Sequence, residues 1–254
     1  MAFALVALPA TWYLEDRIAD RQEAQTEQLA SAAEAQENLR FARELSTQRG
    51  GAKPMNGIDL RAANLSGLQL GCETRRAPLD AAYPCRGEYP APDAAHMIRA
   101  NLAGADLTAT DLTGAVLAQA DLSGTRLVST GLAGANLDDA RLVDANLSAS
   151  GDINLEALGA TGVVGATLNG ATLVSADLSG ANLSYASVVA VVLINAKLTN
   201  ANLTEAILSR ADLRGADLTG ATLTGAELDS ICFDERTRWP QGFPRPTDPD
   251  GCGR

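Results

Sequence analysis

A bulky apolar residue, most often Leu, recurs at every fifth position through most of this chain. The recurrence forms two series, Met97 to Leu147 and Ile153 to Phe233, and the step between them is six residues instead of five. A small residue, usually Ala, lies two positions before each bulky residue, and the residue between them is often Asp or Asn. A period of five fits neither the 3.6-residue period of a helix nor the two-residue period of a strand. It predicts a solenoid built from short repeated units.

If each unit is a brief extended segment followed by a turn, four units close one square coil. The bulky and the small residue then point inward, and the other three positions face solvent. Coils pair in parallel at about 4.8 Å, so the 28 bulky positions predict seven coils and a rod of about 35 Å. The six-residue step predicts a one-residue bulge within residues 148–152. The expected inner ladder is Leu102, Leu122, Leu142, Val163, Leu183, Leu203 and Leu223.

Several stretches, among them ANLAGADLTATDL, ADLSGANLSYASV and ADLRGADLTGATL, resemble the A(D/N)LXX motif of the pentapeptide-repeat family. The resemblance covers Ile58–Leu70 and Met97–Phe233. It implies an all-β solenoid, namely a right-handed quadrilateral parallel β-helix. An R-W-P-x-G-F tail similar to residues 238–243 follows the repeats in some relatives. We therefore expect Trp239 and Phe243 to cover the C-terminal end of the solenoid, which needs a cap.

The chain divides into five segments. Residues 1–14 are apolar and uncharged, and residues 15–49 lack Pro and are rich in helix-forming residues, which predicts an N-terminal α-helix. Residues 50–96 are interpreted as the first coil with an inserted loop, residues 97–233 as the main repeat array, and residues 234–254 as the cap with a Pro-rich tail.

The apolar N-terminal segment has three possible interpretations. As a helix, its 14 residues reach about 21 Å, which is less than the hydrocarbon core of about 30 Å. It is the remainder of a membrane-spanning helix, a partly inserted anchor, or a segment that packs on protein. We expect association with a membrane.

The helix that follows has Gln22, Gln25 and Gln36 in its heptad stripe, which favours a solvated spacer over a homo-oligomer, the alternative. Its last turns hold Leu39, Phe41, Ala42 and Leu45, which are available to cover the open end of the solenoid.

Four cysteines form two pairs that are close in sequence, Cys72 with Cys85 and Cys232 with Cys252, and neither pair has zinc-type spacing. Each pair brackets an irregular stretch, which predicts two disulfides and an oxidising compartment. The alternative is four unrelated thiols. Together with the apolar N-terminus, this predicts a membrane-anchored protein whose repeat domain lies outside the cytoplasm, with a cytoplasmic protein as the alternative.

No set of residues suggests chemistry. The only histidine, His96, is expected at the surface, and the Asp and Asn residues of the repeats point outward at regular intervals. We expect no catalytic residue, no cofactor and no metal, and therefore no enzyme. The net charge of −11 argues against direct binding to the phosphate backbone of nucleic acid.

Five apolar residues are assigned to outward positions on two adjoining faces, which suggests a surface for a protein partner or for self-association. They are Val174, Val189, Val192, Ile194 and Ile207. Scattered surface residues are the alternative explanation. The sequence thus predicts a non-catalytic, membrane-tethered scaffold for a protein partner of unknown identity. The family resemblance adds a second hypothesis, an acidic DNA mimic that inhibits a type II topoisomerase. Between Met97 and Phe233 there are 14 acidic and 6 basic residues, which is only moderately acidic.

Overall fold

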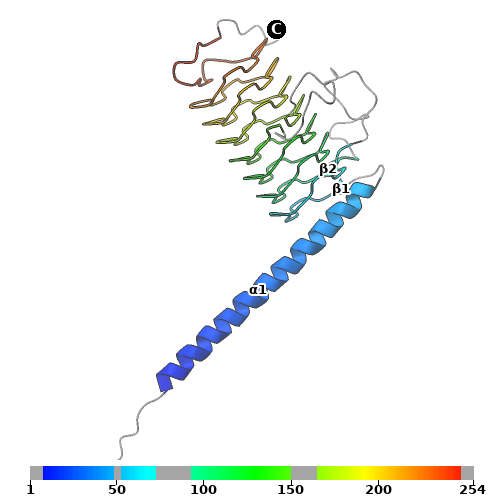
Figure 1. Cartoon of the computed structure of the whole chain (residues 1–254), viewed down its shortest axis with the longest axis vertical. Coiled ribbons are helices and arrows are strands. Elements are labelled where there is room, and N and C mark those ends of the chain that lie inside the picture. Colours follow the sequence, from blue (N-terminus) through cyan, green and yellow to red (C-terminus); the bar gives the residue numbers. More distant parts are fainter. Residues whose placement is uncertain (1–7, 49–52, 73–92, 150–164, 247–254) are drawn as a thin grey trace, which may run out of the picture.

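A computed structural model describes residues 8–48, 53–72, 93–149 and 165–246. A long helix, α1 (Leu8–Thr47), precedes the solenoid (Figure 1). Strand β1 (Lys53–Pro54) pairs in parallel with β2 (Ala95–His96), with Lys53 opposite Ala95. Beyond these two strands, the solenoid is held by single-residue parallel bridges.

Helix α1 has 40 residues, which corresponds to about 60 Å. It contains no Gly, and its one proline, Pro9, lies in the first turn, where a missing N–H costs least. The sequence pattern predicted that the helix starts at residue 15, but it begins earlier, at Leu8. It ends before Gly50, Gly51 and Pro54, which do not favour helix.

The prediction of a membrane-anchored protein is wrong. Within the part of the chain that the structure describes, no helix combines the length and the apolar character needed to cross a bilayer. Helix α1 is long enough, but charged residues follow one another closely from Glu15 onward. Its apolar beginning alone is too short for the hydrocarbon core. Residues 1–7 lie outside the described residues.

The repeats form coils of four units. Asp121 bridges Arg141 and Thr172 bridges Val192, in each case 20 positions further along the chain. The central residue of a unit donates its N–H to the carbonyl one coil on, as Leu122 does to Arg141 at 2.7 Å. Each unit ends in a turn, such as the one in which Ala105 N–H donates to Leu102 O at 2.9 Å.

The core contains the bulky and the small residue of each unit, as the period predicts. Leu102, Leu107 and Ala105 are fully buried. A few threonines take the place of the small residue, and their hydroxyl groups donate to main-chain carbonyls. Thr130 Oγ1 donates to Leu107 O at 2.7 Å, and Thr110 Oγ1 donates to Leu65 O at 2.8 Å. These polar groups are therefore satisfied inside the apolar tube.

The predicted one-residue bulge near Gly151 is wrong. Asn146 bridges Asn182, which is 36 positions on, so this coil contains 16 residues more than the others. Leu142 N–H donates to Asp177 O, and Leu178 therefore follows Leu142 in the inner ladder in place of Val163. Ile153, Leu158 and Val163 lie outside the described residues. A physical reason is visible in the sequence, because Glu156 occupies the inward position of the Leu158 unit, where a carboxylate would be desolvated.

A second interruption of the five-residue repeat occurs in the first coil, at the place that the sequence pattern predicted. Asp59 bridges Asn101, 42 positions on, and Ala95 N–H donates to Leu70 O at 2.8 Å. The coil therefore continues from Leu70 to Ala95, and residues 73–92 lie outside the described residues.

Both described cysteines, Cys72 and Cys232, are disulfide-bonded. Cys85 and Cys252 lie outside the described residues. The pairing of Cys72 with Cys85 and of Cys232 with Cys252 therefore stays a prediction.

Helix α1 covers the N-terminal end of the solenoid. Ala42 and Leu45 are buried in the core cluster, and Leu39 packs against it. Asn38 Nδ2 also donates to Asp59 O at 3.0 Å. Phe41, which was expected to help cover this end, is 42% exposed.

The C-terminal end is closed by one more, degenerate unit. Arg238 bridges Asp217, 21 positions away, and Thr237 is buried in the position of the small residue. Trp239 takes the place of the bulky residue. Its ring lies edge-on to Phe233 and stacks on Phe243, with both pairs of ring centroids 5.6 Å apart. Trp239 and Phe243 thus form the expected lid.

Candidate interaction surface

The solenoid has four faces, and each is a column of stacked units. We number the faces in chain order, starting from the unit centred on Leu122, and name each by its central residues in two successive coils. Face 1 contains Leu122 and Leu142, face 2 Leu127 and Leu147, face 3 Leu132 and Leu168, and face 4 Leu137 and Leu173. On every face, the residues before and after the central one point outward. Each face therefore presents two parallel columns of side chains at a rung spacing of about 4.8 Å.

Acidic and basic residues alternate along face 1. In the column before the central residues, the bridges join Asp121, Arg141, Asp177, Lys197, Asp217 and Arg238 in this order. Lys197 Nζ lies 3.6 Å from Asp177 Oδ2, and Arg238 Nη1 lies 3.4 Å from Asp217 Oδ2.

Both paired carboxyl groups have a lowered pKa. For Asp177, burial acts in the opposite direction, but hydrogen bonds from Ser179 and the charge of Lys197 lower the pKa below its usual value. For Asp217, the hydrogen bond from Thr219 and the charge of Arg238 lower the pKa against the effect of burial. Asp177 and Asp217 therefore stay negatively charged at neutral pH.

Face 2 presents amides and hydroxyl groups instead. Asn146, Asn182 and Asn202 occupy successive rungs, and Asn202 Nδ2 donates to Asn182 Oδ1 at 3.2 Å. Thr204 Oγ1 donates to Asn202 Oδ1 at 2.7 Å. These groups satisfy one another, which explains the Asn-rich units as a stabilising ladder.

The five residues predicted to bind a protein are brought together on faces 3 and 4. Val189 and Ile207 lie on face 3, and Val174, Val192 and Ile194 lie on face 4. Ile207 is 37% exposed and the other four are half-buried. We call these five residues the apolar strip.

The rungs of the ladder place the members of the apolar strip in successive coils, with one pair, Val174 and Ile194, directly stacked. Ser175 N–H donates to Ile194 O at 2.9 Å, so Val174 and Ile194 occupy equivalent positions in successive coils. Thr172 bridges Val192, and Ser187 bridges Ile207.

Two neighbouring residues were missed by sequence reasoning. Tyr185 is 42% exposed in the turn between faces 2 and 3, and Ala190 lies in the turn between Val189 and Val192. An aromatic side chain at a turn position that elsewhere holds Gly, Ala or a polar residue was a signal that was available in the sequence.

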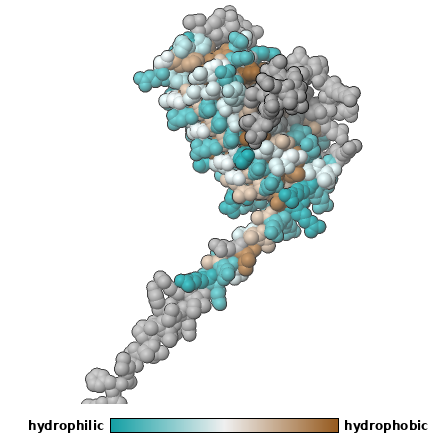
Figure 2. Space-filling model, in the orientation of Figure 1, coloured by the Kyte–Doolittle hydropathy of each residue, from teal (hydrophilic) through white to brown (hydrophobic). Residues whose placement is uncertain are grey.

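Face 3 also lacks charge over most of its length. Among the described residues, its outward positions from Thr113 to Ser209 carry no Asp, Glu, Lys or Arg. Apart from Asn169, Val189 and Ile207, they are small or hydroxyl-bearing residues such as Ala133, Thr167 and Ser187. On the side of the molecule seen in Figure 2, hydrophilic side chains are interspersed with smaller apolar areas.

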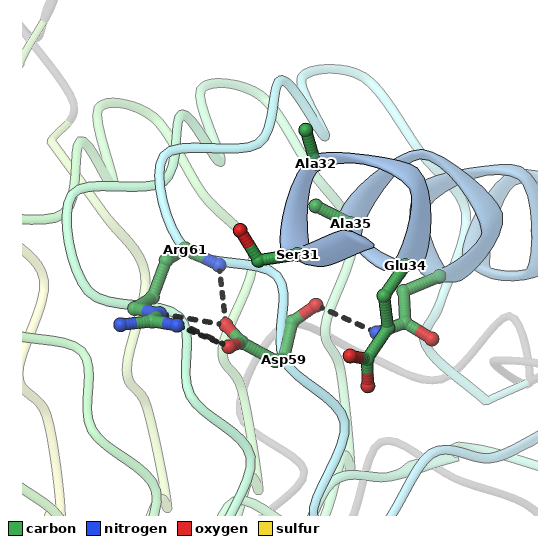
Figure 3. Close-up of a pocket in the computed structure, with 7 residues that line it drawn as sticks. Ser31, Ala32, Glu34, Ala35, Asp59 and Arg61 are labelled. Atoms are coloured by element: carbon green, nitrogen blue, oxygen red, sulfur yellow. Dashed lines mark hydrogen bonds and ion pairs between the residues drawn. The ribbon is translucent and has the colours of Figure 1, made fainter. Parts of the chain in front are cut away.

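A cleft lies where α1 meets the first coil (Figure 3). It has a volume of about 370 Å³ and is lined by Ser31, Ala32, Glu34, Ala35, Asn38, Asp59 and Arg61. Arg61 Nη2 lies 2.7 Å from Asp59 Oδ2, and this pairing lowers the pKa of Asp59. Asp59 and Arg61 thus neutralise each other within the first coil, and the hydrogen bond from Asn38 Nδ2 to Asp59 O attaches α1 to this coil.

The residues that the structure describes contain no group of three or more His, Cys, Asp or Glu side chains suited to a metal. His96 is half-buried on face 4 and belongs to the bridge ladder between Pro54 and Val116.

Comparison with known proteins identifies the repeats. The family model of pentapeptide repeats matches eight copies, within residues 95–130, 164–197 and 189–225. No curated protein matches.

Several solved structures are similar to this chain. The structure of HetL, a pentapeptide repeat protein involved in heterocyst differentiation regulation from the cyanobacterium Nostoc sp. strain PCC 7120, is 29% identical over 74% of this chain and 91% of that chain, with a TM-score of 0.27. Another from Nostoc PCC 7120, alr5209, is 28% identical over 49% of this chain and 77% of that chain, with a TM-score of 0.21. QnrB1, a plasmid-mediated fluoroquinolone resistance protein, is 16% identical over 74% of this chain and 92% of that chain, with a TM-score of 0.25. Residues 95–130 and 164–225 are therefore pentapeptide repeats.

Proposed function

We propose that the chain is a non-catalytic scaffold whose rod binds a protein partner through the apolar strip. The observation that carries this proposal is the gathering of Val174, Val192 and Ile194 beside Val189 and Ile207 on two adjoining faces. Sequence distance separates these residues, and the coil register makes them neighbours. Contiguous exposed apolar side chains are typical of interaction sites.

The surroundings of the strip favour a protein partner. The outward positions of face 3 from Thr113 to Ser209 are uncharged in the described part of the chain, so a partner does not have to desolvate charges there. Tyr185 stands at the edge of the strip, and aromatic residues are enriched in interface cores. The main-chain ladder fixes the strip in place, so binding costs little ordering entropy.

A photocrosslinking experiment tests the proposal. A photoreactive amino acid replaces Val192 in one version of the full chain and Val143 in another; Val143 is a half-buried valine on face 1. We expect a protein adduct from position 192 that position 143 does not give. The same adducts from both positions would contradict the proposal.

Affinity measurements with the identified partner complete the test. The double variant Val192→Asp, Ile194→Asp places two carboxylates on the strip and is expected to weaken binding at least tenfold, or about 1.4 kcal/mol. Thr204→Asp, Thr224→Asp adds the same charge to face 2, which neither proposed surface includes, and serves as the control. Equal affinities of the two double variants for the partner would refute the role of the strip.

The alternative of an acidic DNA mimic has less support. A mimic of duplex DNA needs a continuous negative field, whereas Arg141, Lys197 and Arg238 interrupt the acidic residues of face 1. Faces 2 and 3 present mainly uncharged outward residues in the described coils.

A further inference from the structure

We propose that face 1 is a self-complementary surface through which two copies of this chain associate side by side, in opposite directions, about a twofold axis. The proposal is independent of the apolar strip, which lies on other faces. It rests on the order of charge along one column of bridged residues. That order is Asp121, Arg141, Asp177, Lys197, Asp217 and Arg238.

An alternating column with an even number of rungs is complementary to its own reverse. When a second copy is placed on face 1 with its axis reversed, Asp121 faces Arg238 of the second copy. Arg141 then faces Asp217, and Asp177 faces Lys197. Twofold symmetry repeats each pair, since residue i contacts residue j and residue j contacts residue i. All six rungs therefore meet opposite charges at once.

The shape of the column suits such a contact. The basic side chains are the more exposed ones, at 63% for Lys197 and 73% for Arg238, while Asp177 and Asp217 are 32% and 27% exposed. Long cations thus project from each copy toward carboxylates that lie closer to the surface of the other. The adjacent outward column contains no side chain larger than valine, so two copies can approach closely. It consists of Ser123, Val143, Ser179, Thr199, Thr219 and Pro240.

The alternation also selects the register. A slip of one rung, about 4.8 Å, places acids opposite acids and bases opposite bases. A slip of two rungs toward α1 brings the second copy's Arg238 to Asp59. That carboxylate is already paired with Arg61 and lies beside Ser31 and Ala32 of α1 (Figure 3). The central register is therefore favoured.

The contact is expected to be weak and sensitive to salt. A single face of six rungs is smaller than a standard interface, and exposed ion pairs contribute little each. Sedimentation equilibrium of the full chain over a concentration series is therefore done at about 0.01 M and about 1 M salt, where the Debye length is about 30 Å and about 3 Å. We expect a monomer–dimer equilibrium at low salt that shifts to monomer at high salt. A monomer at all concentrations in low salt would overturn the proposal.

Two charge reversals make the test specific for the register. Arg141→Asp alone creates two Asp–Asp contacts across the twofold axis, and Asp217→Arg alone creates two Arg–Arg contacts. Each is expected to weaken the dimer about tenfold or more. In an equimolar mixture, Asp at 141 of one variant faces Arg at 217 of the other, and the second pair is the native Arg141 with Asp217. We therefore expect the mixture to form a heterodimer as readily as the native chain forms its dimer.

The mixing result separates the proposal from other causes. Damage to the rod by either reversal is not repaired by mixing, because the neighbours within each chain stay the same. Arg126→Asp, which makes the same charge change on face 2, is the control and is expected to leave the dimer unchanged. An equal loss with Arg126→Asp, or a mixture that associates no better than the single variants, would overturn the proposal.

Discussion

Substitution by glycine usually destabilises a protein, but at certain turns of this solenoid we expect it to stabilise the fold. In most units the residue two positions after the central residue has a positive φ, and among the described residues this position holds a residue other than glycine with positive φ at 15 places. Ala109 has φ of 54°, and Gly104, in the preceding unit, has φ of 68°. A left-handed conformation costs a residue with a Cβ about 1–2 kcal/mol, and glycine avoids this cost.

Ala109→Gly is therefore expected to stabilise the fold. Removing the backbone strain at Ala109 stabilises the folded state, but the greater conformational freedom of glycine in the unfolded chain offsets about 0.4–1 kcal/mol of this effect. The free energy of unfolding should therefore rise by about 0.5–1 kcal/mol. Gly104→Ala is expected to destabilise by a similar amount. A Cβ at Gly104 would meet no atom within 4 Å, so a change there reports conformational strain without a clash.

Urea unfolding of the full chain, followed by circular dichroism, measures both effects as shifts of the midpoint with an unchanged slope. Ala62 and Ala190 also have positive φ, so the triple variant with glycine at positions 62, 109 and 190 should gain about 2 kcal/mol. A lower midpoint for Ala109→Gly, or no change for Gly104→Ala, would refute the reasoning.

Three further predictions concern acid, the C-terminal lid and the cysteines. Hydrogen bonds from Arg236 and from the N–H of Gly215, acting against burial, lower the pKa of Asp234 to about 2. Because its pKa is depressed on folding, Asp234 stabilises the fold above its ordinary value of 3.8, and this stabilisation is lost as pH falls from about 4 toward about 2. The urea midpoint of Asp234→Asn should depend less on pH over this range than that of the native chain, and equal slopes would contradict the assignment. Trp239→Ala should destabilise by about 2 kcal/mol, less than a fully buried aromatic residue, because Trp239 is half-buried against Phe233 and Phe243; calorimetry measures the loss. Peptide mapping without reductant should recover Cys72 linked to Cys85 and Cys232 linked to Cys252, and other linkages would show that the predicted pairing is wrong.

Much of the fold could be predicted from the five-residue period. It places Leu102 and Ala105 in the core, and the aromatic residues beyond Phe233 identify Trp239 as the lid. The five-residue period alone does not reveal an insertion whose apolar residues keep the same spacing. Ile153, Leu158 and Val163 keep the spacing, and only Glu156 at an inward position indicates that this segment does not continue the core.

The alternation on face 1 depended on information that a single sequence does not contain. Its residues become neighbours through a coil register that includes a step of 36 positions. With a one-residue bulge, Arg141 would precede Gly162 in its column, and the alternation on face 1 would be hidden. In the structure, Arg141 bridges Asp177, and the alternation of charge along the column becomes visible. The apolar strip was identified because all of its residues lie after the insertion, where the period is undisturbed.

The proposed surface on face 1 rests on the register across the insertion, and one cross-linking measurement tests this register directly. Asn146 bridges Asn182, and stacked parallel residues lie at a spacing that a disulfide can span. Under mild oxidation, the variant Asn146→Cys, Asn182→Cys should give a linked peptide between positions 146 and 182. The variant Asn146→Cys, Thr167→Cys, which a one-residue bulge would bring together, should give no such link. A link between 146 and 167, with none between 146 and 182, would contradict the coil register and the alternating column of face 1 that is built on it.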